Sequence, residues 1–132
     1  IQDNVILSGN RLFFLEPLES TAVQSYIQWA RLCYDLITGN STKENIISTF
    51  QTYIKRVQNF IYWHYINGSA YDTPFWKYAA KYKIKDKHFD QILNYVKTTP
   101  INEVRDERIS KNKLLYGQWA AITFKMWQEG VS

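Results

Sequence analysis

Apolar positions recur at helical spacing along most of the chain. After Thr21 they lie three and four positions apart, a period that predicts an amphipathic helix; they are Val23, Tyr26, Ile27, Ala30, Cys33, Tyr34 and Ile37. Three more apolar residues, Trp29, Leu32 and Leu36, widen this surface. We therefore expect a helix that is buried on most sides.

A second, longer helix is predicted directly after the first. Gly39-Asn40 ends the first helix, since both residues tolerate the left-handed backbone that stops helices. Ser41-Thr42-Lys43-Glu44 has the capping-box form that starts another. One apolar stripe then continues for about six turns, through Ile46, Ile47, Phe50, Ile54, Val57, Phe60, Ile61, His64 and Tyr65. Asn67-Gly68-Ser69 breaks this helix.

Two shorter helices follow in the pattern. Asp72 or Thr73 can cap a third helix, with Pro74 in its first turn, where the missing N–H costs little. A fourth helix is predicted from about Asp86, ending before Pro100. Its inward residues would be Phe89, Ile92, Leu93 and Val96.

The two ends of the chain complete the predicted fold class. Residues 102–112 are charged and predict a loop or short irregular helix, and a last helix would carry Leu115, Trp119, Ile122 and Met126. Val5-Ile6-Leu7, ended by Ser8-Gly9-Asn10, predicts a short strand. A lone strand needs a sheet to pair with. The sequence thus predicts a mainly α, nearly all-α piece of a larger protein with one short orphan β-strand at its N-terminus.

Composition narrows the class of protein further. Of the 132 residues, 45% are hydrophobic and 17% aromatic, which favours a folded core or a pocket for a flat ligand over disorder. The net charge of +4 is spread along the chain, with no basic run beyond residues 81–87, which disfavours nucleic acid as a partner. No apolar stretch reaches the roughly 18 residues of a membrane span, so we expect no membrane partner.

The single cysteine indicates the cellular compartment, and the first residue indicates whether the chain is a fragment. Cys33 is alone, which excludes an internal disulfide and favours a reducing, cytoplasmic compartment. It falls on the apolar helical face, so we expect a buried, inert thiol. The chain starts at Ile1 and its one methionine is Met126. We therefore expect a fragment of a longer protein, natural or truncated.

Two sequence motifs carry the chemistry. In the run from Phe13 to Ala22, a Pro-containing loop brings Glu19 to the start of the first helix, where free backbone N–H groups bind anions readily. This run resembles the Glu-Pro-Leu-Glu-Ser-Thr-Gly stretch of the flavin-dependent tryptophan halogenase family. His64-Tyr65, followed by the segment from Asp72 to Trp76, resembles a second stretch of that family in the same order.

The resemblance implies a catalytic role for Glu19. In the family, the matching glutamate polarises the halogenating electrophile or takes the ring proton, work that gives typically about 10²–10⁴-fold in rate. The halide would be held by the residues that follow, Ser20, Thr21 and Ala22. Ala22 replaces the family's glycine, which narrows the backbone angles open to this site.

The resemblance also implies a cofactor and a reaction. Reduced FAD and O₂ would oxidise a halide ion to hypohalous acid, which a lysine then positions against an aromatic carbon. Cofactor contacts would come from Gly9, Asn10 and Pro17. Asn10 and Arg11 depart from the family's Gly-Asp pattern here. No metal is implied.

The resemblance further implies an indole-like substrate. The matching positions line the family's substrate pocket; here they are His64, Tyr65, Tyr71, Phe75 and Trp76. Tyr71 stands where the tryptophan-specific members have a glutamate for the substrate's amino group, and Ala80 stands where they have an asparagine. Losing both polar anchors argues for a less polar indole or a phenol, because a charged amino acid needs matched partners.

The matched part of the family is its C-terminal portion. Residues 1–19 would be the end of the FAD-binding region and residues 20–132 a helical substrate-side domain. The Gly-rich dinucleotide fingerprint and the lysine have no counterpart here, so the fragment alone is expected to be inactive. The parent would be an FADH₂-dependent oxidoreductase. Its partners would be the missing N-terminal half and a flavin reductase, and exposed apolar surface would favour self-association.

Other interpretations of the same residues stay open. Glu19, Ser20 and Thr21 also suit ordinary helix capping, the aromatic cluster suits a helix–helix core, and Gly9-Asn10 suits a plain turn. The chain could be a non-catalytic helical binding or scaffold module. It could also belong to a monooxygenase-like relative that hydroxylates instead of halogenating.

Overall fold

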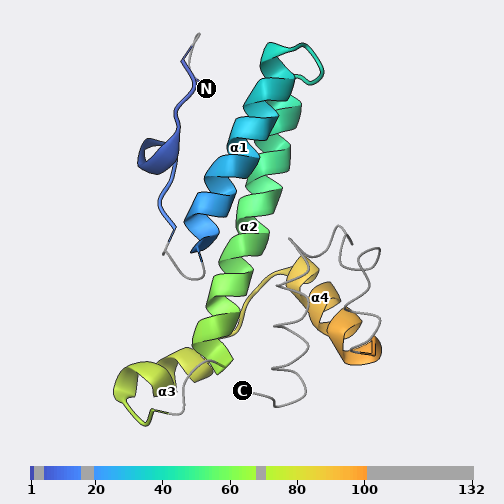
Figure 1. Cartoon of the computed structure of the whole chain (residues 1–132). Coiled ribbons are helices and arrows are strands. Elements are labelled where there is room, and N and C mark those ends of the chain that lie inside the picture. The colour runs from blue at the N-terminus through green and yellow to red at the C-terminus, as the bar shows by residue number, and fades with distance from the viewer. Residues whose placement is uncertain (2–4, 16–19, 68–70, 101–132) are drawn as a thin grey trace. The chain divides into compact units, whose positions relative to one another are not determined.

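A computed structural model of the chain describes residue 1 and residues 5–15, 20–67 and 71–100. Its elements are a single 3₁₀ turn, η1 (Gly9–Arg11), and four helices, α1 (Thr21–Ile37), α2 (Lys43–Asn67), α3 (Pro74–Ala80) and α4 (Lys87–Thr98) (Figure 1). The chain divides into two compact units, Ile1–Gln58 and Asn59–Ser132. The predicted loop at 102–112 and the predicted last helix lie outside the described residues. The described part is mainly α-helical, as predicted.

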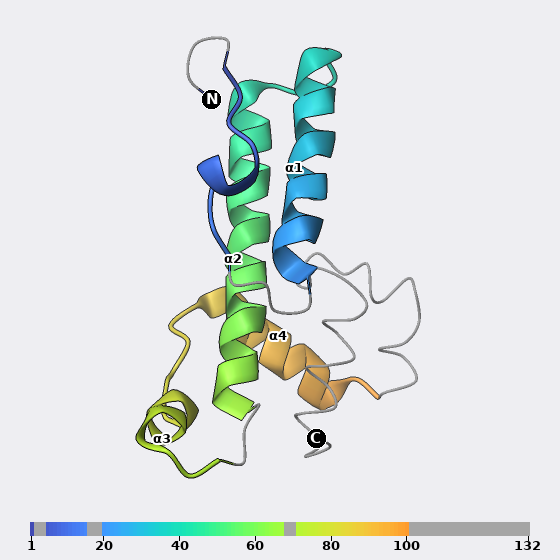
Figure 2. The same cartoon turned by 60° about the vertical axis from the view of Figure 1, so that its left-hand side comes forward.

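The first unit is built on an antiparallel helix pair. Helix α1 and the first part of α2 lie side by side in both views (Figures 1 and 2). Gly39 adopts φ +77° just after α1, and the Asn40 N–H donates to the Asp35 carbonyl at 2.8 Å. The Thr42 hydroxyl accepts from the Asn45 N–H at 3.2 Å and caps α2. The predicted stop and the predicted restart are therefore confirmed.

A small apolar cluster holds this pair together. Trp29 and Cys33 of α1 meet Ile46 and Phe50 of α2, and the Trp29 and Phe50 ring centroids lie 4.7 Å apart. Burying such side chains contributes about 1.5–3 kcal/mol each. Burial also raises the pKa of the Cys33 thiol, which keeps it protonated at neutral pH. The predicted buried thiol is confirmed.

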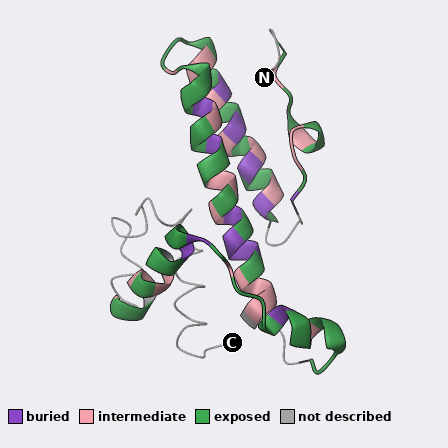
Figure 3. Ribbon diagram, turned by 180° about the vertical axis from the view of Figure 1, so that it is seen from behind, coloured by how far each residue is buried: buried purple, intermediate pink, exposed green. Residues whose placement is uncertain are grey.

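The predicted buried face of α1 is wrong in part. Thr21, Ser25, Trp29 and Cys33, spaced four apart, are its buried residues (Figure 3). The predicted stripe is instead largely exposed: Val23 by 58%, Ile27 by 50%, Tyr34 by 65% and Ile37 by 75%. Apolar residues occupy both faces of this helix, so periodicity located the helix without selecting the face. Packing against Phe50 selected the face that carries Trp29.

The predicted strand at Val5–Leu7 is also wrong for the described residues. Val5 forms only an isolated bridge and no strand follows. The segment packs on the helix pair instead: the Trp29 Nε1–H donates to the Leu7 carbonyl at 2.9 Å. The Phe13 ring lies 5.2 Å from that of Tyr26 and 5.4 Å from that of Phe50. A strand needs a neighbouring strand. Here Ile6 packs against the apolar cluster of the helix pair, whereas Val5 and Leu7 are 59% and 43% exposed.

In the second unit, the end of α2 and the two short helices follow the predicted pattern. Helix α2 ends at Asn67, and the Thr73 side chain caps α3 with Pro74 in its first turn. Asp86 caps α4, and Phe89 is buried with its ring 5.3 Å from that of Trp63. The side chains of Ile92 and Val96 lie outside the described residues.

No helix in the described ranges is both long enough and apolar enough to span a bilayer.

Candidate functional site

The start of α1 carries the predicted halide residues. Ser20, at the N-cap, has φ +59° and its side chain makes no capping hydrogen bond. Thr21 is buried, Ala22 is half-buried, and the Thr21 carbonyl accepts from the Ser25 hydroxyl at 2.7 Å. Glu19 and Pro17 lie outside the described residues, so the structure places the residues that follow Glu19 and not its carboxylate.

This helix start differs from the other three described helix starts. Thr42, Thr73 and Asp86 each accept a hydrogen bond from a first-turn N–H of α2, α3 and α4, respectively. Helix α1 has no such bond and no acidic residue in its first turn. The Ser20 side chain therefore gives no acceptor to the first turn of α1, and no first-turn carboxylate compensates the helix dipole. The positive end of a helix dipole favours a small anion.

The predicted cofactor turn at Gly9 and Asn10 is held by contacts within the chain. Gly9 adopts φ +58°, a left-handed angle that suits glycine, and it opens η1. The Asn10 side-chain oxygen accepts a hydrogen bond from the Tyr26 hydroxyl, and the Leu12 N–H donates to the Gly9 carbonyl. The Asn10 side-chain oxygen and the Gly9 carbonyl thus bond within the chain, and a role of this turn in cofactor binding stays a prediction.

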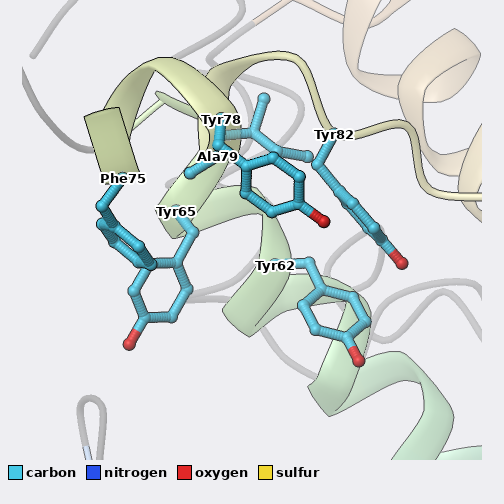
Figure 4. Close-up of a pocket in the computed structure, with 7 residues that line it drawn as sticks. Tyr62, Tyr65, Phe75, Tyr78, Ala79 and Tyr82 are labelled. Atoms are coloured by element: carbon cyan, nitrogen blue, oxygen red, sulfur yellow. The ribbon is translucent and has the colours of Figure 1, made fainter. Parts of the chain in front are cut away.

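The second unit contains a groove with an aromatic lining, which we call the tyrosine groove (Figure 4). The end of α2, helix α3 and the turn after α3 supply its lining, which consists of Tyr62, Tyr65, Ile66, Phe75, Tyr78, Ala79 and Tyr82. Its volume is about 440 Å³, within the range of about 300–1,000 Å³ that holds small molecules. None of these seven side chains carries a formal charge at neutral pH.

The predicted substrate residues Tyr65, Phe75 and Trp76 come together at this groove. Tyr65 and Phe75 line it, with ring centroids 6.1 Å apart at 88°. Trp76 stacks behind Tyr65, with ring centroids 5.8 Å apart at 24°, and meets Phe75 edge-on at 5.0 Å. Stacked and edge-on pairs at these separations are favourable. The three rings thus brace one end of the groove.

The other two predicted substrate residues lie away from the groove lining. The His64 Nδ1 lies 2.9 Å from the Phe60 carbonyl, and the two rings meet edge-on at 4.4 Å. A carbonyl oxygen only accepts hydrogen bonds, so in this contact Nδ1 is the ring nitrogen of His64 that carries a hydrogen. Tyr71 is 77% exposed, just before α3.

Five lining residues were not singled out from the sequence. They are Tyr62, Ile66, Tyr78, Ala79 and Tyr82. Spacing could have found three of them: Tyr62 lies three positions before Tyr65, and Tyr78 and Ala79 lie three and four positions after Phe75, on the same helix faces. Ile66 directly follows Tyr65 and Tyr82 lies beyond the end of α3, so helical spacing does not mark these two. The spacing signal is weak by itself, because the same spacing describes any helix–helix contact.

In the described part of the chain, no group of three or more His, Cys, Asp and Glu side chains is arranged to hold a metal ion. The acid–base shifts that stand out lie in the first unit. Burial raises the pKa of the Tyr53 hydroxyl, and a hydrogen bond with the Ser25 hydroxyl partly offsets this rise. Burial lowers the pKa of the Arg56 guanidinium.

Comparison with known proteins relates the chain to tryptophan halogenases in two ways. Residues 1–129 match the family model described as tryptophan halogenase. The chain is 24% identical to the tryptophan 6-halogenase ThaL of Streptomyces albogriseolus, over 96% of this chain and 24% of that protein. The chain therefore spans about a quarter of the length of the curated relative it matches. No solved structure matches it.

Proposed function

Because this chain belongs to the tryptophan halogenase family, we propose that it is the C-terminal, substrate-side part of an FAD-dependent halogenase. The complete enzyme chlorinates or brominates an indole-like aromatic molecule. The observation that carries this proposal is the start of α1, directly after Glu19, where the Ser20 side chain makes no capping hydrogen bond and no first-turn residue is acidic.

In this proposal the start of α1 holds the halide. Ser20, Thr21 and Ala22 supply backbone N–H groups, and the absence of an acidic residue in the first turn leaves the positive end of the helix dipole uncompensated. Ala22 is compatible with this role because its backbone is helical and needs no glycine-only angle.

Glu19 handles the proton in the substitution step. Hypohalous acid transfers its halogen to a ring carbon, a carbon–halogen bond forms, and the halogen–oxygen bond breaks. The ring then loses a proton to the Glu19 carboxylate. Glu19 passes that proton to the hydroxide left by the hypohalous acid, which leaves as water. A positioned base of this kind contributes about 10²–10⁴-fold to the rate.

The tyrosine groove binds the aromatic substrate. Tyr65 and Phe75 line one end, and Trp76 braces Tyr65 from behind. The groove and the start of α1 belong to different compact units, so the proposal rests on the chemistry of each and on no distance between them.

The rest of the parent supplies what this chain lacks. The sites for reduced FAD, which would supply halide oxidation with O₂ as the oxidant, and the lysine that positions hypohalous acid would belong to the N-terminal part of the parent, with a flavin reductase as the electron source. The chain by itself is therefore expected to give no turnover.

The test is a halogenation assay of the complete protein encoded by the gene, supplied with FAD, a flavin reductase, O₂, bromide and an indole. Wild type is expected to give a brominated product. Glu19→Gln is expected to lower kcat by about 10²–10⁴-fold, because the amide cannot accept the ring proton. Product is measured by mass spectrometry.

A matched control is Glu44→Gln, the same substitution at an exposed position in the first turn of α2. It is expected to leave kcat unchanged. The proposal fails if both variants behave alike. A hydroxylated product formed equally well without bromide would instead support the monooxygenase alternative.

A further inference from the structure

The tyrosine groove is larger than an indole needs. Its volume of about 440 Å³ lies well inside the range of about 300–1,000 Å³ of pockets that hold drug-sized molecules, which are larger than indole. Tyr65 and Phe75 occupy one end, and Tyr62, Tyr78 and Tyr82 form the other (Figure 4). An indole against Tyr65 and Phe75 would leave the second end unfilled.

The second end is held in place by local structure. The Tyr62 and Tyr82 ring centroids lie 5.5 Å apart at 55°. The turn after α3 sets the position of Tyr82, because its N–H donates to the Ala79 carbonyl at 3.0 Å, and the Lys81 N–H donates to the Tyr78 carbonyl at 3.1 Å. Tyr62 and Tyr82 are 42% and 45% exposed, so both residues stay accessible to a ligand.

The polar groups of this end are hydroxyls alone. In the described part of the chain, the hydroxyls of Tyr62, Tyr78 and Tyr82 make no internal hydrogen bond, and a phenol can both donate and accept. A charged ammonium or carboxylate placed here would lose water without gaining an opposite charge. A neutral ligand with a hydroxyl or carbonyl group would lose much less.

We propose that the tyrosine groove binds an uncharged aromatic molecule longer than indole. One ring lies against Tyr65 and Phe75, and a hydroxyl or carbonyl group at the far end bonds to Tyr62 and Tyr82. As a statement about substrate, this inference rests on the proposed function; as a statement about binding, it stands on the groove itself.

The test is equilibrium dialysis of the full chain, without flavin or halide, against 4-hydroxybiphenyl, indole and L-tryptophan. The expected order of affinity is 4-hydroxybiphenyl, then indole, then L-tryptophan, with at least tenfold between the first and the last. Tyr62→Phe and Tyr82→Phe should each weaken 4-hydroxybiphenyl binding by about 2–10-fold, the effect of one lost hydrogen bond, and leave indole within about twofold.

Tyr34→Phe is the matched control, since Tyr34 is exposed on α1 in the other unit, and it should change nothing. The inference is overturned if L-tryptophan binds as tightly as 4-hydroxybiphenyl. It is also overturned if Tyr82→Phe has no more effect than Tyr34→Phe. The ligand order in wild type decides the question even if a variant unfolds.

The outcome is separable from that of the halogenation assay. Failure of 4-hydroxybiphenyl to bind, together with bromination of an indole by the complete protein, removes the ligand class and leaves the proposed function. The expected binding order without any halogen transfer supports the groove ligand and removes the halogenase.

Discussion

At the scale of single residues, Ser20 combines an unusual backbone angle with a place in the proposed halide site. It is the one described non-glycine residue with positive φ, at +59°, and its side chain does not cap α1. A left-handed residue with a Cβ costs roughly 1–2 kcal/mol. Strain of this kind gathers at functional sites, and here it lies directly after Glu19.

Ser20→Gly and Ser20→Val test this strain. Glycine removes the Cβ clash and loses no capping bond, so the free energy of unfolding should rise by about 0.5 kcal/mol after the entropy cost of glycine. Valine is branched at Cβ and should lower it by about 1–2 kcal/mol. Urea unfolding of the chain measures both. Equal effects of the two variants would contradict a strained backbone at residue 20.

At the scale of elements, Asp86 has two structural roles: it caps α4, and it joins α4 to α2. Its Oδ1 accepts from the His88 N–H at 3.0 Å and caps α4, while its Oδ2 accepts from the Asn59 Nδ2–H of α2 at 2.7 Å. Asn59 and Asp86 are both buried. One carboxylate therefore starts a helix and joins it to another within the second unit.

Asp86→Ala should lower the free energy of unfolding by about 2–3 kcal/mol. The cap accounts for about 1 kcal/mol, and the buried Asn59 amide left without its acceptor accounts for about 1–2. Asp90→Ala, at an exposed position in the first turn of the same helix, should cost less than about 0.5 kcal/mol. Denaturant unfolding followed by circular dichroism compares them. A similar small loss for both would mean that Asp86 is only a surface cap.

At the scale of the whole molecule, the exposed apolar face of α1 is the feature that the fold leaves uncovered. Val23, Ile27, Tyr34 and Ile37 are each at least half exposed, and their spacing puts them on one helix face. Soluble proteins seldom leave such a face in water unless it meets a partner. In the proposed parent, we expect the rest of the protein to cover this face; in the chain alone, we expect a second copy to do so.

The chain is therefore expected to self-associate as its concentration rises. Ile27→Lys combined with Ile37→Lys should shift the equilibrium to monomer, because two charges replace the apolar contact. The control is Gln24→Lys with Thr49→Lys, which adds the same charge at exposed polar positions and should change association much less. Sedimentation velocity over a concentration series makes the comparison. A wild type that stays monomeric at every concentration would contradict the expectation.

The sequence by itself determined the four described helices and their ends. The residues that start and stop these helices contact backbone groups close to them in the chain, so they can be recognised without knowing the fold. They are Gly39, Thr42, Thr73 with Pro74, and Asp86. The long stripe of α2 was likewise predicted, because its apolar residues keep to one face. The two motifs also sufficed to indicate the family to which the chain belongs.

Only the tertiary structure decided which surfaces meet. Helix α1 has apolar residues on both faces, and Trp29 packing on Phe50 selected the buried one. The pattern at Val5–Leu7 predicted a strand, but this segment meets the helix pair, where the Leu7 carbonyl accepts from Trp29. Tyr65 and Phe75 were predicted together, whereas Tyr62 of α2, Tyr78 of α3 and Tyr82 of the following turn join them only in the folded groove. Contacts between residues distant in the chain depend on shape and packing, which a one-dimensional pattern does not contain.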